Sequence, residues 1–458
     1  MRKHSLIIWL LLTAIVLSSF TGCSKNPQQD AASSGVETTV PQAESTAPVI
    51  EEIDYAGTMT LDMDSPTLKQ EVTVKQFIDG DTTHFYVPES VNISGVLKAR
   101  YLSINTPEST GKIEEYGKKA SAFTREKLSN ATSIIIESED GAWNADSTGD
   151  RFLVWVWYMP AGSDTYRNLN VEILQNGLAI ANSSANNRYG ETCMAAIAMA
   201  KQLKLNIYSG QQDPDFYYGS AVELTLKELR TNIEQYSGVK VAFSGVVTVN
   251  DSNSVYVESY DPETDMYYGI SVYYGYNLNG QGLEIINVGN EVRIVGSVQY
   301  YEAGGTWQVS DLNYRMMKPD DPDNIQKLSE GHSPAYVLTD PAALADQTVD
   351  ILVNEESMVF DYAQLAMNTS VEIRDLYVYD AYTTDKEGSA SNGAMTLYCR
   401  AGEYNIAVRT IVLYDENGEL VTQDRFLGKT IDVRGLIDYF NGDYQIKVFN
   451  INDITIHE

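Results

Sequence analysis

Apolar and polar residues alternate over much of the chain from residue 72 onward, which predicts short strands with one buried face. Residues 72–78 and 84–87 are two such runs, and Asp79-Gly80-Asp81-Thr82 lies between them as a turn signal. The next apolar run, 96–104, contains one arginine, Arg100. We therefore expect a hairpin, then a strand with a buried cation, then a helix over 116–128 and strands over 133–137 and 152–158.

The C-terminal half contains two similar segments, residues 221–318 and 361–456. Gly289–Tyr301 and Gly428–Phe440 follow the same pattern, and each is followed by a glycine-containing turn and a closing strand. Five short strands per copy, with a glycine inside one of them, resemble small oligonucleotide-binding (OB) barrels. We predict barrels at 219–318 and 361–458, joined by a partly structured linker at 319–360 whose Lys318–Pro334 portion is rich in Asp, Pro and Ser.

The N-terminus has the pattern of an export signal. Arg2 and Lys3 precede an apolar run from Leu6 to Leu17, which is too short for a permanent membrane span. The following Ser19-Phe20-Thr21-Gly22-Cys23 resembles a bacterial lipobox. We expect residues 1–22 to be a lipoprotein signal peptide, Cys23 to carry lipid, and residues 23–65 to be a disordered tether. This places the protein at the extracellular face of the cell membrane.

Charge limits the partners of the chain. The formal net charge is −31, and most of it falls on residues 219–458. Such a surface repels polyanions unless a local basic site or a cation intervenes. The region of residues 66–218 is much closer to neutral, so nucleic acid is expected there rather than at the C-terminal half.

The three cysteines do not suggest a disulfide framework. Cys193 lies in a predicted helix and Cys399 in a predicted strand. Both are expected to be ordinary buried thiols.

Several motifs in residues 66–218 occur in a recognisable order. They are Asp79-Gly80-Asp81-Thr82, Arg100, Thr106-Pro107-Glu108, Tyr116-Gly117 with Ala120–Thr124, Asn170 with Gly177-Leu178-Ala179, and Lys204–Ser209. Together they resemble the staphylococcal nuclease family, whose members hydrolyse phosphodiester bonds of DNA and RNA with one calcium ion. The resemblance implies an α+β, mainly β chain: a staphylococcal-nuclease-type OB-fold barrel at 66–218, followed by the two OB-like β-barrels.

The resemblance also implies residue roles. Asp81, Asn105 and the backbone carbonyl of Thr106 would bind Ca²⁺, with Asp79 behind them. Glu108 would activate water as a general base, and Arg100 and Arg151 would hold the phosphate. This set is chemically coherent, because calcium prefers oxygen ligands and two guanidiniums compensate the charge that develops on the phosphoryl oxygens.

The chain departs from the family pattern at three places. Asn105 stands where the family has a ligand Asp, which removes one charge from the cation site and predicts weaker calcium binding. The segment Asp146–Arg151 is one residue longer and sets Asp150 beside Arg151. The family's base-stacking tyrosines are replaced in the loop that contains Asn182, Ser183 and Ala185.

These observations leave more than one function open. The first hypothesis is a membrane-anchored, calcium-dependent nuclease acting on DNA or RNA. The second is a catalytically weak or inactive lipoprotein that binds nucleic acid or protein, and the third is an adhesion or assembly component made of contact modules. The C-terminal barrels are expected to be spacers or protein contacts. Their tyrosines form either a stacking platform or ordinary edge and core positions, the latter being favoured: Tyr267, Tyr268, Tyr273, Tyr274 and Tyr276.

Overall fold

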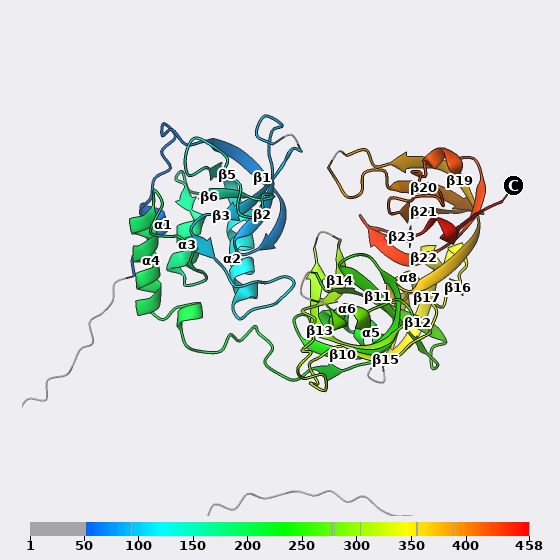
Figure 1. Ribbon diagram of the computed structural model, residues 1–458. Helices are drawn as coiled ribbons and strands as arrows, with labels where there is room; N and C mark the ends of the chain where they lie inside the picture. Colours follow the sequence, from blue (N-terminus) through cyan, green and yellow to red (C-terminus); the bar gives the residue numbers. More distant parts are fainter. Residues whose placement is uncertain are drawn as a thin grey trace, which may run out of the picture. The chain divides into compact units, whose positions relative to one another are not determined.

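The structure is a computed structural model that describes residues 52–457, except Ile93, Tyr276, Asn277, Asn279, Ala303, Asn354, Glu355 and Glu387. The predicted signal peptide, the lipidation site Cys23 and most of the predicted tether lie outside the described residues. Three closed five-stranded barrels follow one another along the chain (Figure 1). The prediction of a mainly β fold with some helix, in three barrels, is confirmed.

The first barrel closes through two kinds of pairing. Its strands are β1 (Lys69–Asp79), β2 (Thr82–Tyr86), β3 (Val96–Tyr101), β5 (Ala131–Glu137) and β6 (Phe152–Pro160). Neighbours pair antiparallel, and β3 closes the barrel by pairing parallel to β6. The predicted hairpin is confirmed, since Asp79 pairs with Thr82 around the Gly80-Asp81 turn.

Three helices pack on the first barrel: α2 (Gly117–Ser129), α3 (Leu169–Gln175) and α4 (Gly190–Gln202). Asn168 caps α3 by accepting a hydrogen bond from the Val171 N–H at 3.0 Å. Trp155 and Trp157 of β6 are fully buried in the core beneath these helices. The short elements of this region are β7 (Arg167–Asn168), β8 (Ile180–Ala181) and a 3-10 turn at Asn206–Tyr208.

The strand expected over 96–104 is interrupted. β3 ends at Tyr101, and Ser103 has a left-handed backbone with φ of +70°. The chain then turns into a separate strand, β4 (Ile104–Asn105), which pairs with β8. The prediction of one continuous strand was wrong, and the bend is what brings Asn105 and Thr106 back toward the β1–β2 turn.

The last part of the predicted tether is ordered. Residues 52–65 are described and include α1 (Tyr55–Thr58), which packs on α3 and α4. Both Oδ atoms of Asp54 accept hydrogen bonds from the Arg167 guanidinium at 2.7 Å, and Gln175 Oε1 accepts from the Ala56 N–H at 2.9 Å. These bonds offset the chain entropy that is lost when the segment becomes ordered. The polar composition alone suggested that this loss would keep the segment disordered.

The second barrel consists of β10 (Lys240–Asn250), β11 (Ser254–Asp261), β12 (Met266–Tyr273), β13 (Glu291–Tyr301) and β14 (Thr306–Ser310). It closes through β10 and β13. Its smaller elements are β9 (Val222–Glu223), α5 (Leu226–Thr231), a 3-10 turn at Ile233–Tyr236 and α6 (Gln281–Ile285).

The third barrel repeats this plan. Its strands are β19 (Ser370–Thr383), β20 (Met395–Ala401), β21 (Tyr404–Thr410), β22 (Thr430–Phe440) and β23 (Asp443–Val448), and β19 closes it with β22. Gly296 in β13 and Gly435 in β22 occupy matching places. A Cβ on either glycine would lie 2.5 Å from a backbone oxygen of the next strand, of Ser310 or Lys447. This close approach explains the mid-strand glycine that both sequence copies share.

The segment between these barrels contains more structure than a linker. Within the expected Lys318–Pro334 connection, β15 (Gln326–Ser329) pairs with β13. The following elements are β16 (Val337–Leu338), α7 (Pro341–Ala345), β17 (Thr348–Val353), β18 (Glu356–Asp361) and α8 (Tyr362–Leu365). Two short elements complete the third barrel: a 3-10 turn at Gln423–Arg425 and, after a turn at Ile451–Asp453, β24 (Ile454–Ile456). Among the helices of the described residues, none has the length and apolar character needed to cross a bilayer.

Candidate functional site

The β1–β2 turn places two carboxylates in the protein interior. Asp79 and Asp81 are 7% and 3% exposed. The Asp81 N–H donates to Asp79 Oδ1 at 3.1 Å, and the Thr124 hydroxyl of α2 donates to the Gly80 carbonyl at 2.6 Å. A side chain on Gly80 would meet Thr106 and Ala120 within 3 Å, so the turn requires glycine here.

Arg100 reaches this turn from β3. Its guanidinium forms an ion pair with Asp81 Oδ1 and donates to Asn105 Oδ1 at 2.5 Å. The second oxygen of Asp81 accepts a hydrogen bond from the Thr106 N–H at 2.8 Å. The predicted metal ligands and one predicted phosphate-binding arginine therefore lie together, with the arginine bound to the ligands.

Glu108 lies at the exposed side of the same group. No hydrogen bond or ion pair from any residue that the structure describes reaches its carboxylate, although its backbone exchanges hydrogen bonds with Glu114. Partial dehydration raises the pKa of Glu108, and the charge of Asp79 raises it further, while Arg100 and Arg151 oppose the shift. Glu108 is therefore close enough to Asp79, Arg100 and Arg151 for its carboxylate to interact with their charges.

Arg151 is held by a carboxylate outside this group. Its Nε and a terminal nitrogen donate to Asp146 Oδ2 at 2.8 and 2.7 Å. Asp150, which the sequence sets beside it, instead pairs with Lys98 at 2.5 Å. The partnership of Asp146 with Arg151 was not predicted, although the Asp-Ser-Thr-Gly pattern before Arg151 carries the signal for it.

Burial disfavours the charged forms of Asp79 and Arg100. It raises the pKa of Asp79, and Arg100, the Thr82 hydroxyl and Arg151 act against that rise. Burial likewise lowers the pKa of Arg100, with Asp79 opposing. In both groups the loss of hydration outweighs the stabilisation that neighbouring charges supply to the charged form.

The donor set fits a hard divalent cation in chemical type. Asp81 supplies a carboxylate, Asn105 an amide oxygen and Thr106 a backbone carbonyl, all of them oxygen donors. The same Asp81 and Asn105 oxygens bind Arg100, so a cation at this position requires Arg100 to turn away from them.

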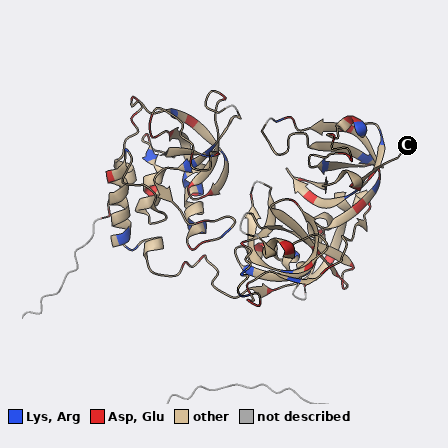
Figure 2. Cartoon of the chain, in the orientation of Figure 1, with Lys and Arg blue, Asp and Glu red and all other residues tan. Residues whose placement is uncertain are grey.

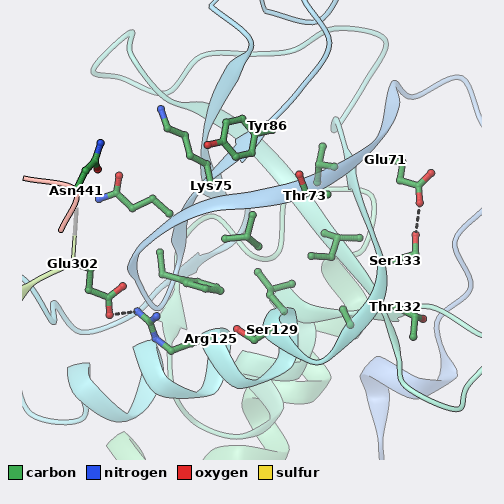
Figure 3. A pocket seen from close by; sticks show the side chains of 17 residues that line it. Glu71, Thr73, Lys75, Tyr86, Arg125, Ser129, Thr132, Ser133, Glu302 and Asn441 are labelled. Atoms are coloured by element: carbon green, nitrogen blue, oxygen red, sulfur yellow. Dashed lines mark hydrogen bonds and ion pairs between the residues drawn. The ribbon is translucent and has the colours of Figure 1, made fainter. Parts of the chain in front are cut away.

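Among the hollows that the described residues line on this part of the molecule, two differ in their position relative to the site. One, of about 700 Å³, opens beside the site and is lined by Asn105, Pro107, Tyr116 and Ile180, among others. The other, of about 990 Å³, lies outside the barrel along β1, where Arg125 of α2 stacks on Phe77 and Ser133 donates to Glu71 (Figure 3). Only the first adjoins the predicted site residues.

Two further sequence expectations concern the cysteines and the tyrosines of the second barrel. Cys193 and Cys399 are buried, as expected, and burial raises the pKa of each thiol to about 12, which disfavours the reactive thiolate. In the second barrel Tyr268 and Tyr274 are buried, and Tyr276 lies outside the described residues. Tyr267 and Tyr273 are half-buried, so the four described tyrosines occupy core and edge positions, which agrees with the favoured alternative.

The described residues contain one group of three carboxylate or imidazole side chains close enough to share an ion: Asp375, Asp432 and His457, in the third barrel. Within it His457 Nε2 lies 2.8 Å from Asp432 Oδ1. Against the effect of burial, the hydrogen bond from the Asp375 N–H and the contact with His457 lower the pKa of Asp432, and the charge of Arg374 adds to this.

A closed five-stranded barrel with buried carboxylates and two guanidiniums near one turn defines a site suited to an anionic phosphate ester. Residues 98–210 match the family described as staphylococcal nuclease homologue. The match contains Arg100, Asn105, Thr106, Glu108 and Arg151, and it begins after the hairpin that carries Asp79 and Asp81. Residues 98–210 are thus similar to a domain of this family.

Proposed function

We propose that the first barrel is a calcium-dependent nuclease that hydrolyses phosphodiester bonds of DNA or RNA. The observation that supports it is the convergence of Asp81, Arg100 and Glu108, with Arg151 close enough to influence the pKa values of Arg100 and Glu108. The adjacent hollow of about 700 Å³ offers room for a nucleotide beside them.

In the proposed reaction, Arg100 and Arg151 exchange their present partners, Asp81 and Asp146, for oxygens of the scissile phosphate. The carboxylate of Glu108 accepts a proton from the attacking water. Asp81, Asn105 and the Thr106 carbonyl would hold calcium, which would supply further positive charge to the phosphoryl oxygens. The guanidiniums compensate charge most strongly in the transition state, where it is greatest.

The test uses the full chain, single-stranded DNA and millimolar calcium. We expect digestion that stops when a chelator is added. Glu108→Gln removes the base and Arg100→Lys removes the bidentate contact, so both should lower the rate by about a hundredfold or more with an unchanged circular dichroism spectrum. Glu126→Gln, an exposed glutamate on α2, is the matched control and should retain full activity.

A second candidate function is a binding module without turnover. The observation that favours it is that the Asp81 and Asn105 oxygens are occupied by Arg100. Absence of cleavage in calcium, together with retained binding of single-stranded DNA that Arg100→Lys weakens, would support this candidate and exclude the nuclease.

We also propose that residues 1–22 direct export and that Cys23 is lipidated, which would anchor the chain at the extracellular face of the membrane. The support is the residue pattern around Cys23. In cells, the chain should partition into the detergent phase, and Cys23→Ser should move it to the aqueous phase. Equal partitioning of the two forms would exclude a lipid anchor at Cys23.

A further inference from the structure

The outer face of the third barrel carries a cluster of exposed aromatic side chains. Tyr377, Tyr379, Tyr382 and Tyr398 are between 39% and 56% exposed. They lie on the adjacent strands β19 and β20, whose opposite faces bury Val378 and Leu397. Exposed aromatic groups that gather in this way mark contact surfaces more often than isolated ones do. We name these four side chains the tyrosine face.

The strand register brings polar groups between the rings. Tyr398 pairs with Asp380 and Tyr377 pairs with Arg400, and a bulge after Val378 leaves both Tyr379 and Asp380 exposed. The Arg400 guanidinium stands over the Tyr379 ring, 5.2 Å from its centroid.

Two arginines on this face keep hydrogen-bonding capacity. Arg409 donates to the hydroxyls of Thr396 and Thr384 at 3.1 and 3.0 Å. Neither Arg400 nor Arg409 takes part in an ion pair among the described residues, whereas Arg374 and Arg434 of the same barrel both pair with Glu372. The surface around the tyrosine face therefore offers guanidinium donors from Arg400 and Arg409 as well as a carboxylate acceptor from Asp380.

A hollow of about 560 Å³ adjoins the tyrosine face. It is lined by Tyr379, Tyr398, Asn405 and Asp443 and by apolar side chains that include Leu344. The site thus combines flat aromatic surfaces with a concave end and with convergent polar groups, which are features of ligand-binding sites.

We propose that the tyrosine face binds a neutral oligosaccharide. Tyrosine rings stack against the apolar faces of sugar rings, and Asp380, Asn405 and Arg400 match hydroxyl groups as acceptor and donors. A neutral ligand also avoids the repulsion that a net charge of −31 imposes on polyanions. This proposal goes beyond the nuclease activity and does not depend on it.

A single-stranded nucleic acid is the alternative occupant, since bases also stack on aromatic rings. Such sites add a positively charged groove along the backbone. Here Asp380 lies among the tyrosines and Asp443 lines the hollow, so the arginine charges are offset. Charged residues of both signs are spread over the described chain (Figure 2).

The experiment is calorimetric titration of the full chain with chitohexaose and with cellohexaose, in the presence of chelator. We expect binding of at least one of them, with Tyr398→Ala and Tyr379→Ala each weakening it about tenfold. Tyr398→Phe retains the ring and should bind nearly as well, which separates loss of stacking from loss of folding. Tyr414→Ala is the matched control, because Tyr414 is 57% exposed in the same barrel but outside the tyrosine face.

Three results would overturn the proposal. The first is that neither hexasaccharide binds. The second is that the alanine variants bind as the wild type does. The third is that an oligothymidylate binds through Tyr398 and Arg400 in a salt-dependent way, which would assign the face to nucleic acid. Arg425→Ala is the charge control for this titration, because Arg425 is exposed and forms no ion pair among the described residues.

Discussion

At the scale of single residues, the site is organised by Arg100. Its guanidinium joins the β1–β2 turn to the start of the Thr106-Pro107-Glu108 segment through Asp81 and Asn105. Buried charges require such partners, because water no longer stabilises them. Arg100 therefore holds the site together in this structure, and its exchange of partners is the central step of the proposed reaction.

The residue that most directly sets calcium affinity is expected to be Asn105. Asn105→Asp adds a full negative charge beside Asp81, so calcium affinity should rise by about tenfold and the rate at limiting calcium should rise with it. Calcium titration of activity measures the change. Asn130→Asp adds the same charge at the exposed end of α2 and should have no effect. If the titrations of Asn105→Asp and wild type coincide, residue 105 is not a ligand.

The pH dependence of cleavage is expected to follow Glu108. A general base acts when deprotonated, and the raised pKa of Glu108 means that activity is lost as pH falls through a value above that of an ordinary glutamate. Glu114 contributes to this rise through its charge. Glu114→Gln should therefore move the acidic limb of kcat/KM, measured at saturating calcium, to lower pH. An unmoved limb would show that another group controls it.

At the scale of elements, the sequence predicted the helices and strands whose sequence pattern is local. The hairpin followed from an Asp-Gly turn between alternating strands, and α2 began within one residue of its expected start. The break after Tyr101 was not visible, because Leu102, Ser103 and Ile104 continue the alternation while Ser103 takes a left-handed backbone. Likewise, polar composition did not reveal that Asp54 binds Arg167, a contact far along the chain.

Within the candidate site, the resemblance predicted the members but not their pairings. Asp81, Arg100, Asn105 and Thr106 lie together as expected. The pairing of Arg151 with Asp146 depends on the conformation of a lengthened loop, which residue order does not specify.

Asn170 connects three elements around the break after β3. Its side chain is fully buried, accepts from the Val156 N–H at 2.9 Å and donates to the carbonyls of Leu102 and Val154. Asn170→Ala leaves buried backbone groups without partners, so we expect a loss of about 3 kcal/mol in the free energy of unfolding. Chemical denaturation measures it, and Asn130→Ala, at an exposed position, should change stability by less than about 1 kcal/mol. A small loss for Asn170→Ala would mean that water replaces the amide.

At the scale of the whole molecule, the repeat in the sequence predicted two barrels of one plan, and the shared glycines Gly296 and Gly435 show why the pattern recurs. The tyrosines were harder to assign. Period-two alternation does not say which face of a barrel strand is inside. Tyr268 and Tyr274 of the second barrel are therefore buried, whereas Tyr377, Tyr379, Tyr382 and Tyr398 of the third are exposed.

The overall charge leads to a prediction about salt. With a net charge of −31, long-range repulsion opposes the approach of DNA to the first barrel. The screening length falls from about 30 Å at 0.01 M salt to about 10 Å at 0.1 M, so the repulsion from distant parts of the chain weakens over this range while close contacts persist. We therefore expect kcat/KM for single-stranded DNA, at saturating calcium, to rise between these salt concentrations. Bis(p-nitrophenyl) phosphate carries one charge and should show a smaller change. A steep fall for DNA would instead show that local arginine–phosphate contacts dominate the approach of substrate.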